Sequence, residues 1–187
     1  MKTSAELEEQ ATLQVLSLMA AAARTAPKTR GIDNIRVMAI DDPASKDRLA
    51  ARMRELAKLE DRPGFERDAG NVDSSSAVLM IGVESNPAGL NCGFCGHGRC
   101  EELERANGIC AFNSIDLGIA ACSAAAVAAD SRVDTRLMYS VGRAGLALDL
   151  FGGKVKVALG IPLSITGKSP FFDRPSRPVQ LPQPQTR

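Results

Sequence analysis

The chain has 187 residues, of which 44% are hydrophobic and 24% charged, a balance that predicts one compact domain with its own hydrophobic core. The net charge of +1, one tyrosine and no tryptophan argue against nucleic-acid binding, because no basic face is interleaved with aromatic side chains. The most apolar stretch, residues 115–129, is too short and too rich in alanine to span a bilayer, and no export signal is visible, so we expect a cytoplasmic protein without a membrane partner.

The first elements follow from the spacing of apolar residues. Residues 5–24 predict a largely buried helix, because leucine, methionine and alanine recur at helical intervals and acidic residues occupy the first turn. A strand is expected over 35–40, and Asp41-Asp42-Pro43 ends it. A second helix then covers 43–59, with apolar residues on one side and charged residues on the other.

The middle of the chain is expected to hold the core strand. Residues 61–76 are polar, with a short helix near Phe65, and the run 77–83 is apolar throughout. Such a run is typical of a central strand that is covered on both faces. A short helical segment at 101–106 and a long alanine-rich helix at 113–129 follow, and small side chains let that helix pack tightly.

The last part of the chain predicts a strand at 136–141, a short helix at 144–150 and a final strand at 155–161, which ends at a proline. The alternation of helices and strands indicates an α+β domain built on a mixed sheet that helices flank. We expect this single globular domain to span residues 1–174, and the proline-rich end, 175–187, to be an extended or disordered tail.

Four of the five cysteines are concentrated between the apolar strand and the alanine-rich helix, at Cys92, Cys95, Cys100 and Cys110. Their spacing, C-x2-C-x4-C-x9-C, suits a [4Fe-4S] cubane cluster, because four thiolates must reach four corners of the cluster. Gly93, Gly96 and Gly98 give the backbone freedom to wrap around such a core, and backbone amides in this turn can donate hydrogen bonds to its sulfides. The segment 91–110 is therefore a candidate ferredoxin-like motif.

Structural zinc is the main alternative for these cysteines, because tetrahedral four-cysteine sites also begin with C-x2-C. Zinc sites usually present two such pairs, whereas a single pair is followed here by two isolated cysteines, so the spacing favours a cluster. A disulfide framework is the weakest option. Free thiols in a chain without a visible export signal indicate a reducing compartment. The chain is also large enough to fold without disulfide bonds.

The run Cys92–Cys100 (CGFCGHGRC), with Asp116–Ala120 (DLGIA), Asp134–Tyr139 (DTRLMY) and Gly167–Arg174 (GKSPFFDR), resembles an uncharacterised prokaryotic family of ferredoxin-domain proteins over nearly the whole chain. The C-G-x-C-G-x-x-x-C segment is also similar to four-cysteine [4Fe-4S] domains of electron-transfer complex subunits. That resemblance implies that the first three cluster ligands are Cys92, Cys95 and Cys100. In those domains the last cysteine lies further along the chain, so Cys110 is assigned by proximity and Cys122 stays open as a substitute.

A second resemblance is to the nitroreductase superfamily, and it rests on the order of several short motifs. They are Ala22–Pro27 (AARTAP), a strand, Asp41–Pro43 opening a helix, the apolar strand at Val78, the helix at Asp116–Ala120 and Ala158–Pro162 (ALGIP). The resemblance implies an FMN-binding homodimer with the flavin at the subunit interface. The family's arginine-arginine-serine phosphate clamp is missing, as are its asparagine and glutamine after the proline. Arg24, Lys28 and Arg30 are therefore the nearest candidates for the FMN phosphate, since cations suit that dianion.

Further residues near these motifs have both a functional and an ordinary interpretation. His97, the only histidine, is placed to tune a cluster or donate a proton, but a solvent-facing loop residue is the favoured interpretation. Arg99 either offsets the negative charge of a cluster or begins a solvated helix. Cys122 lies among small residues on a helix, where buried packing is favoured over ligation. Residues 168–174 form either a loop over a ligand or an arm around a dimer partner.

Together these observations predict an iron-sulfur electron-transfer or oxidoreductase-type protein with one [4Fe-4S] cluster, together with FMN if the second resemblance extends to the cofactor. We expect it to work as a homodimer with an external redox partner. The alternative is a zinc-stabilised binding or regulatory protein with a structural four-cysteine site. A third hypothesis is a metal-sensing or cluster-storage protein. No general acid, base or nucleophile is identifiable from the sequence.

Overall fold

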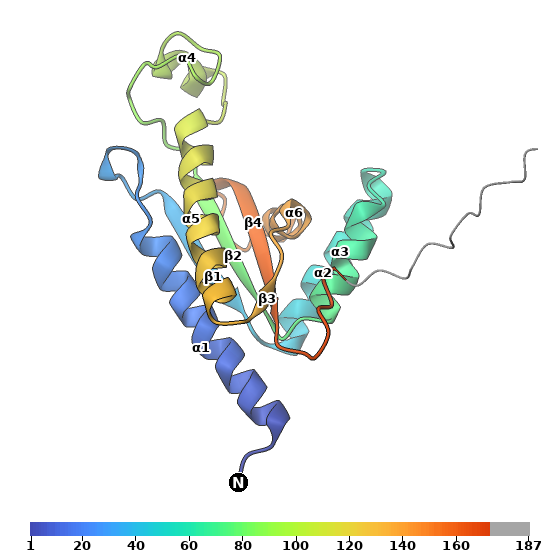
Figure 1. The fold of residues 1–187 in the computed structure, drawn as a ribbon. Coiled ribbons are helices and arrows are strands. Elements are labelled where there is room, and N and C mark those ends of the chain that lie inside the picture. The colour runs from blue at the N-terminus through green and yellow to red at the C-terminus, as the bar shows by residue number, and fades with distance from the viewer. Residues whose placement is uncertain (173–187) are drawn as a thin grey trace, which may run out of the picture.

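The computed structural model describes residues 1–172, so the predicted tail at 175–187 lies outside the described residues. The elements along this part of the chain are α1 (Ser4–Thr25), η1 (Thr29–Gly31), β1 (Ile35–Ile40), α2 (Pro43–Leu59), α3 (Gly64–Asp73), β2 (Ala77–Glu84), α4 (Cys100–Arg105), α5 (Ala111–Asp130), β3 (Asp134–Thr135), α6 (Tyr139–Ala147) and β4 (Val155–Ser164). Figure 1 shows them in chain order, with the N-terminus and α4 at opposite ends of the molecule.

The four described strands form one sheet in the order β1-β2-β4-β3. The α+β architecture is as predicted, but the predicted mixture of strand directions is wrong, because every pairing among these strands is antiparallel. The reason lies in the connections. β2 and β4 are neighbours although the cysteine loop, α5, β3 and α6 separate them in sequence, and the chain returns in the opposite direction rather than through a parallel crossover.

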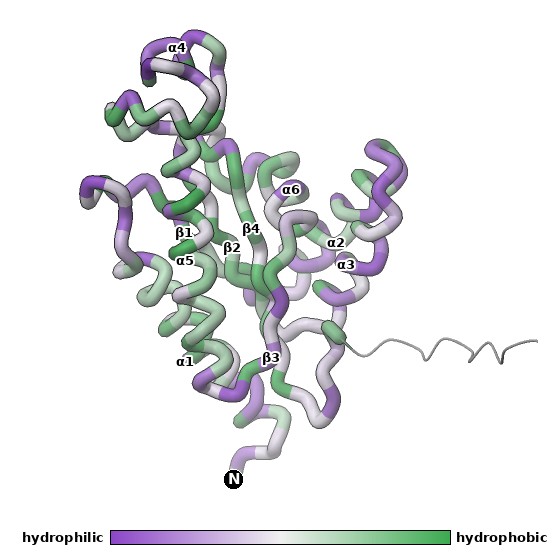
Figure 2. Tube along the Cα trace, turned by 45° about the horizontal axis from the view of Figure 1, so that its top comes forward, coloured by the Kyte–Doolittle hydropathy of each residue, from purple (hydrophilic) through white to green (hydrophobic). Residues whose placement is uncertain are grey.

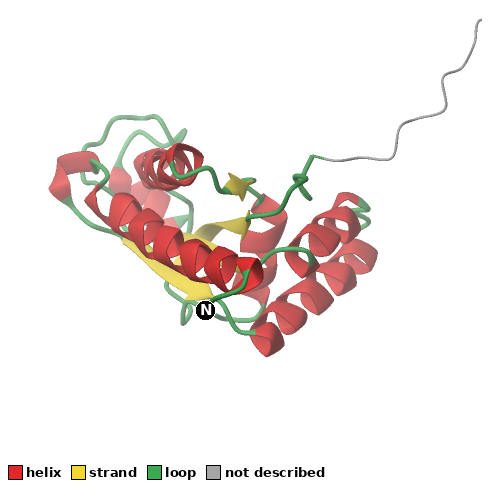
Figure 3. Cartoon of the chain, turned by 60° about the horizontal axis from the view of Figure 1, so that its bottom comes forward, coloured by secondary structure: helices red, strands yellow, loops and turns green. Residues whose placement is uncertain are grey.

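Helices cover both faces of the sheet, as Figures 1 and 3 show, so that β2 and the adjoining part of β4 lie between two helical layers. The side chains of β2 alternate between these layers: Leu79 and Ile81 pack with α1 and α5, whereas Val78 and Met80 pack with α2, α3 and α6. Every residue of β2 except the last is buried, which confirms the predicted central strand. In Figure 2 the hydropathy colouring marks β2 as a hydrophobic segment in the middle of the molecule.

Helix α5 was predicted at 113–129 and is observed at Ala111–Asp130, so it begins two residues earlier and ends one residue later. Among residues 1–172 it is the one helix long and apolar enough, by length and composition, to cross a membrane. Its small residues Ala120, Ala121, Ala124 and Ala128 are all buried, in the cluster that α1 and the sheet also form. Burial of these alanines in the protein core accounts for part of the apolar composition of α5, whereas Ile115 and Ile119 on the same helix are exposed.

The largest departure from the predicted elements follows α5. The chain was expected to form a strand at 136–141, but pairing is limited to β3 and an isolated bridge between Met138 and Gly160, and α6 begins at Tyr139. β4 continues through the proline at which it was expected to end. Close packing explains the position of α6, because Gly142 lies so near β4 that a Cβ atom there would be 1.8 Å from the Ala158 carbonyl oxygen.

We predict that Gly142→Ala destabilises the protein by about 1–3 kcal/mol, because the new methyl group must displace the β4 backbone. Gly118→Ala in α5 is the matched control, since a Cβ atom there meets nothing within 4 Å. It should stabilise the protein by roughly 0.5–1 kcal/mol through helix propensity. Urea unfolding measures both changes. Equal stability of the two variants would contradict the close approach of α6 to β4.

Candidate functional site

The predicted metal ligands lie on one excursion of the chain, residues 85–110, which we call the cysteine loop. It leaves the end of β2, carries the short helix α4, and returns at the start of α5. Figure 1 shows this loop projecting beyond the end of α5, away from the N-terminus. The cysteine-rich insertion is thus a separate feature built on one end of the sheet and helix core.

The C-x2-C pair sits in a tight turn that glycine makes possible. Gly93 and Gly96 have φ values of 77° and 84°, in the left-handed region that favours glycine. The amide N–H of Gly96 donates to the carbonyl oxygen of Gly93 at 3.0 Å, which closes the turn around Phe94 and Cys95. Both Cys92 and Cys95 are at least partly accessible to solvent. The turn therefore presents two thiols on a curved backbone.

Cys100 is held by two hydrogen bonds to one residue. The backbone N–H of Asn91 donates to the Cys100 sulfur over 3.4 Å, and the backbone N–H of Cys100 donates to Asn91 Oδ1 over 2.8 Å. The Glu102 carboxylate accepts from the amides of Gly98 and Arg99 at 3.1 and 3.3 Å, which satisfies free donors at the start of α4. An amide N–H directed at sulfur is the contact that stabilises thiolate charge at metal centres.

Cys110 begins α5 and is buried, with 5% of its surface exposed. The C-x2-C turn reaches it through an aromatic contact, because the ring of Phe94 stacks on that of Phe112 with centroids 5.5 Å apart and planes inclined by 20°. Cys122 was expected to be buried, and this is wrong, since its thiol is exposed. It lies about 18 Å from Cys110 along the helix axis at 1.5 Å per residue.

The donor chemistry of the loop fits a thiolate-bound metal, although its side chains are not gathered around one point. Within residues 1–172, no three side chains of histidine, cysteine, aspartate or glutamate come together as a metal-binding group. The fit rests on four free thiols, a sulfur that accepts an amide hydrogen bond, and left-handed glycines in the turn. The ligand set Cys92, Cys95, Cys100 and Cys110 stays a prediction.

The charged residues of the loop agree with their ordinary interpretations. Arg99 is 63% exposed, and its Nε atom lies 3.9 Å from the exposed carboxylate of Glu101, as at the start of a solvated helix. His97 is half-buried in the loop and has no hydrogen bond or ion pair among the described residues. Neither side chain is positioned by a partner that would prepare it for proton transfer.

A polar network that includes two buried asparagines fastens the base of the loop to the core. The backbone N–H of Asn86 donates to Asn113 Oδ1 in α5, and its side-chain amide donates to Asn34 Oδ1 before β1, both over 3.1 Å. Asn113 and Asn34 are 2% and 8% exposed. Ser85 Oγ adds a bond to the carbonyl of Gly108 at 3.3 Å. The sequence analysis missed these residues, because polar partners so far apart along the chain leave no local pattern.

The three candidate phosphate-binding cations lie in the last turn of α1 and in the segment that follows it before β1, and each has a partner. Arg24 Nη1 is 2.5 Å from the carboxylate of Asp33. Lys28 Nζ donates to three carbonyl oxygens at the C-terminal end of α1, at 2.5–3.4 Å. Arg30 donates to the carbonyl of Ala88, at the base of the cysteine loop, over 2.8 Å. Arg30 is therefore the one of the three whose charge faces neither a carboxylate nor a helix C-terminus.

A buried carboxylate in α5 fixes the backbone between these cations. Asp116 is 4% exposed, and its two oxygens accept the backbone N–H of Thr29 at 3.0 and 3.1 Å. The Thr29 hydroxyl also donates to Asp116 Oδ1 at 2.9 Å. The turn at η1 is thereby tied to the same helix that begins at Cys110. Residues 24–30, which carry the three cations and which we call the cation segment, therefore share α5 with the cysteine loop as a common support.

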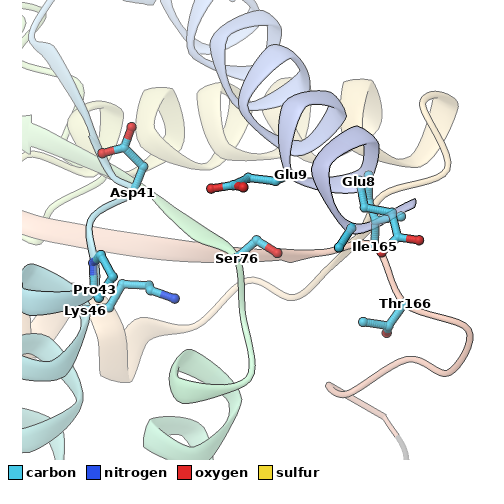
Figure 4. A pocket seen from close by; sticks show the side chains of 9 residues that line it. Glu8, Glu9, Asp41, Pro43, Lys46, Ser76, Ile165 and Thr166 are labelled. Carbon is cyan, nitrogen blue, oxygen red and sulfur yellow. The ribbon is translucent and has the colours of Figure 1, made fainter. Parts of the chain in front are cut away.

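A cavity of about 390 Å³ lies at the opposite end of the sheet from the cysteine loop. Three carboxylates line it, those of Glu8, Glu9 and Asp41, and Lys46 reaches it from α2. Figure 4 shows the side chains of Glu9 and Lys46 extending into this space from α1 and α2. The three carboxylates are all exposed, and the Lys46 amino group donates to the carbonyl of Ser75 at 2.6 Å. None of the residues that line this cavity belongs to the cysteine loop.

Comparison with known proteins gives both family and fold. A family model described as "Uncharacterized protein containing a ferredoxin domain (DUF2148)" matches residues 106–174, a range that includes Cys110 and Cys122. An uncharacterised protein of Archaeoglobus fulgidus is 42% identical over 166 residues, which cover 84% of this chain and 88% of that protein.

Solved structures similar to this chain include flavoproteins. The structure of a nitroreductase with bound FMN from Desulfitobacterium hafniense superimposes with a TM-score of 0.61 and 14% identity, over 95% of this chain and 84% of that chain. A BluB-like flavoprotein from Clostridium difficile has a TM-score of 0.55 and 14% identity, over 88% and 84%. The predicted nitroreductase-like fold is thereby confirmed. The predicted homodimer and redox partner stay predictions.

We predict that Asp116→Asn lowers stability by about 1.5–3 kcal/mol, because one oxygen that accepts from Thr29 becomes an amide donor. Asp130→Asn, an exposed position at the end of the same helix, is the matched control and should change stability by less than about 0.5 kcal/mol. Urea unfolding of both variants provides the comparison. If they unfold at the same midpoint, the support that Asp116 gives to the η1 turn is refuted.

Proposed function

We propose, from the premise that the chain belongs to the family of uncharacterised proteins containing a ferredoxin domain, that it is an oxidoreductase-type protein with one [4Fe-4S] cluster on its cysteine loop. When bound, such a cluster supplies one-electron transfer. The fold alone does not carry this conclusion, because one scaffold serves many activities. The observation that carries it is the concentration of four free thiols on a single loop at one end of the core.

The structure supports Cys92, Cys95, Cys100 and Cys110 as the ligand set. The stacking of Phe94 on Phe112 joins the C-x2-C turn to the start of α5, where Cys110 is located. Cys100 accepts an amide hydrogen bond on its sulfur, a contact typical of cluster ligands. Cys122 is separated from this group by three turns of helix, so we do not assign it to the site.

We also propose that the scaffold binds FMN, with Arg30 as the main cation for its phosphate. The support is the fold shared with a nitroreductase that has bound FMN, together with the cation segment that Asp116 holds in place. Arg24 is neutralised by Asp33 and Lys28 lies against helix carbonyls, whereas Arg30 contacts a neutral carbonyl. A phosphate dianion would gain most from the uncompensated charge.

For the cluster, we predict about four irons and four sulfides per chain after anaerobic purification, with broad visible absorption. Cys92→Ser should lose most of the iron, because a ligand is removed. Cys122→Ser should keep wild-type iron, since its exposed thiol lies outside the proposed ligand set. Metal and sulfide analysis of the three proteins is the measurement. Colourless wild-type protein with one zinc per chain would instead establish the structural four-cysteine alternative.

For the flavin, we predict that the protein binds FMN and that Arg30→Ala weakens binding about tenfold or more, as expected for a lost charge-assisted hydrogen bond. Arg132→Ala is the matched control, because Arg132 is an exposed arginine with the same left-handed backbone, φ 60° against 57° for Arg30. Fluorescence titration with FMN gives the dissociation constants. Equal affinity of the two variants, or no binding by the wild type, would contradict the assignment.

A further inference from the structure

Asn91 is the residue that closes the cysteine loop on itself. It directly precedes Cys92, yet both of its polar contacts reach across the turn to Cys100. Its φ is 49°, in the left-handed region, which asparagine tolerates better than most residues other than glycine. The backbone conformation directs the N–H toward the Cys100 sulfur, while the side chain accepts the Cys100 N–H.

These two bonds enclose three of the four proposed ligands in one ring of backbone. Residues 91–100 leave Asn91, pass through the turn between Gly93 and Gly96, and come back to Asn91 at Cys100. Because the ring is fastened at both ends by the same residue, the Cys100 thiol has a fixed position relative to the C-x2-C turn. A thiolate at Cys100 would also have its charge stabilised by the amide N–H.

We propose that Asn91 is the positioning residue of Cys100: it places the thiol for metal binding and raises the reduction potential of the bound cluster. The effect on the potential rests on the proposed function, whereas the placement of the thiol does not. The side-chain oxygen is the part that can be changed by mutation. Without it, the Cys100 amide is released and the loop is closed by the sulfur contact alone.

Two substitutions separate this role from general loop stability. Asn91→Gly keeps the left-handed backbone and removes the acceptor oxygen, whereas Asn91→Asp keeps the acceptor and adds a negative charge. The matched control is Asn107→Gly. Asn107 belongs to the same loop and has a similar φ of 53°, but its carbonyl and side-chain oxygens accept from Lys156 rather than from a cysteine.

The first experiment measures hydrogen exchange of the Cys100 backbone amide in the metal-free, full-length protein by NMR spectroscopy. We expect Asn91→Gly to raise the Cys100 exchange rate about fivefold, the factor expected for one lost hydrogen bond, because this amide donates to Asn91 Oδ1. Asn91→Asp should stay at or below the wild-type rate, and Asn107→Gly should match the wild type. An unchanged Cys100 rate in Asn91→Gly would overturn the positioning role.

The second experiment measures the reduction potential of the anaerobically purified, cluster-containing proteins. Asn91→Gly should lower the potential, because a loosened amide stabilises the extra electron less, and Asn91→Asp should lower it through its added charge. Asn107→Gly should keep the wild-type value. Potentials that are equal in all four proteins would overturn the tuning role. A wild type without cluster would refute the proposed function, while the hydrogen-exchange result would still decide whether Asn91 positions Cys100.

Discussion

Strand β2 has no solvent-exposed face, and this constraint organises the rest of the molecule. Its side chains pack alternately into the α1 and α5 layer and into the α2, α3 and α6 layer, so both layers depend on the same strand. Because both faces of β2 are covered, the segments that connect it to the rest of the chain reach the surface only at its two ends. The acidic cavity lies at one end, and the cysteine loop departs from the other.

The loop is tied to this core by contacts that differ in kind. Asn86 and its two buried asparagine partners fasten the base, the ring pair of Phe94 and Phe112 connects the tip to α5, and Asn91 closes the segment in between. The side-chain oxygens of the two buried asparagines accept hydrogen bonds from Asn86, and these bonds favour one geometry, because another arrangement would leave buried acceptors without these partners. A loop with few core side chains thus obtains a defined position from its two ends.

The secondary structure could be predicted from the sequence where the spacing of apolar residues along the chain indicates which side chains are buried. The strand at 35–40 and the helix at 43–59 are observed with the predicted limits, and the apolar run at β2 indicated the central strand. The sequence was not sufficient where tertiary packing determines the secondary structure or the exposure of a side chain. The β-like residues after Arg136 become helix α6 because glycine lets that helix approach β4, and Cys122 lies on a side of α5 that faces solvent. Cysteine spacing identified the candidate site, but the asparagines that hold it have partners too distant in sequence to be recognised.

The central claim is that the cysteine loop, including Cys110 and excluding Cys122, holds a redox-active cluster. Electron paramagnetic resonance of the dithionite-reduced, anaerobically purified protein tests it most directly, with Cys110→Ser and Cys122→Ser prepared in parallel. The account predicts the signal of a reduced cluster in the wild type and in Cys122→Ser, and its loss or replacement by a different signal in Cys110→Ser. A signal unchanged in Cys110→Ser and lost in Cys122→Ser, or no signal in the wild type, would contradict it.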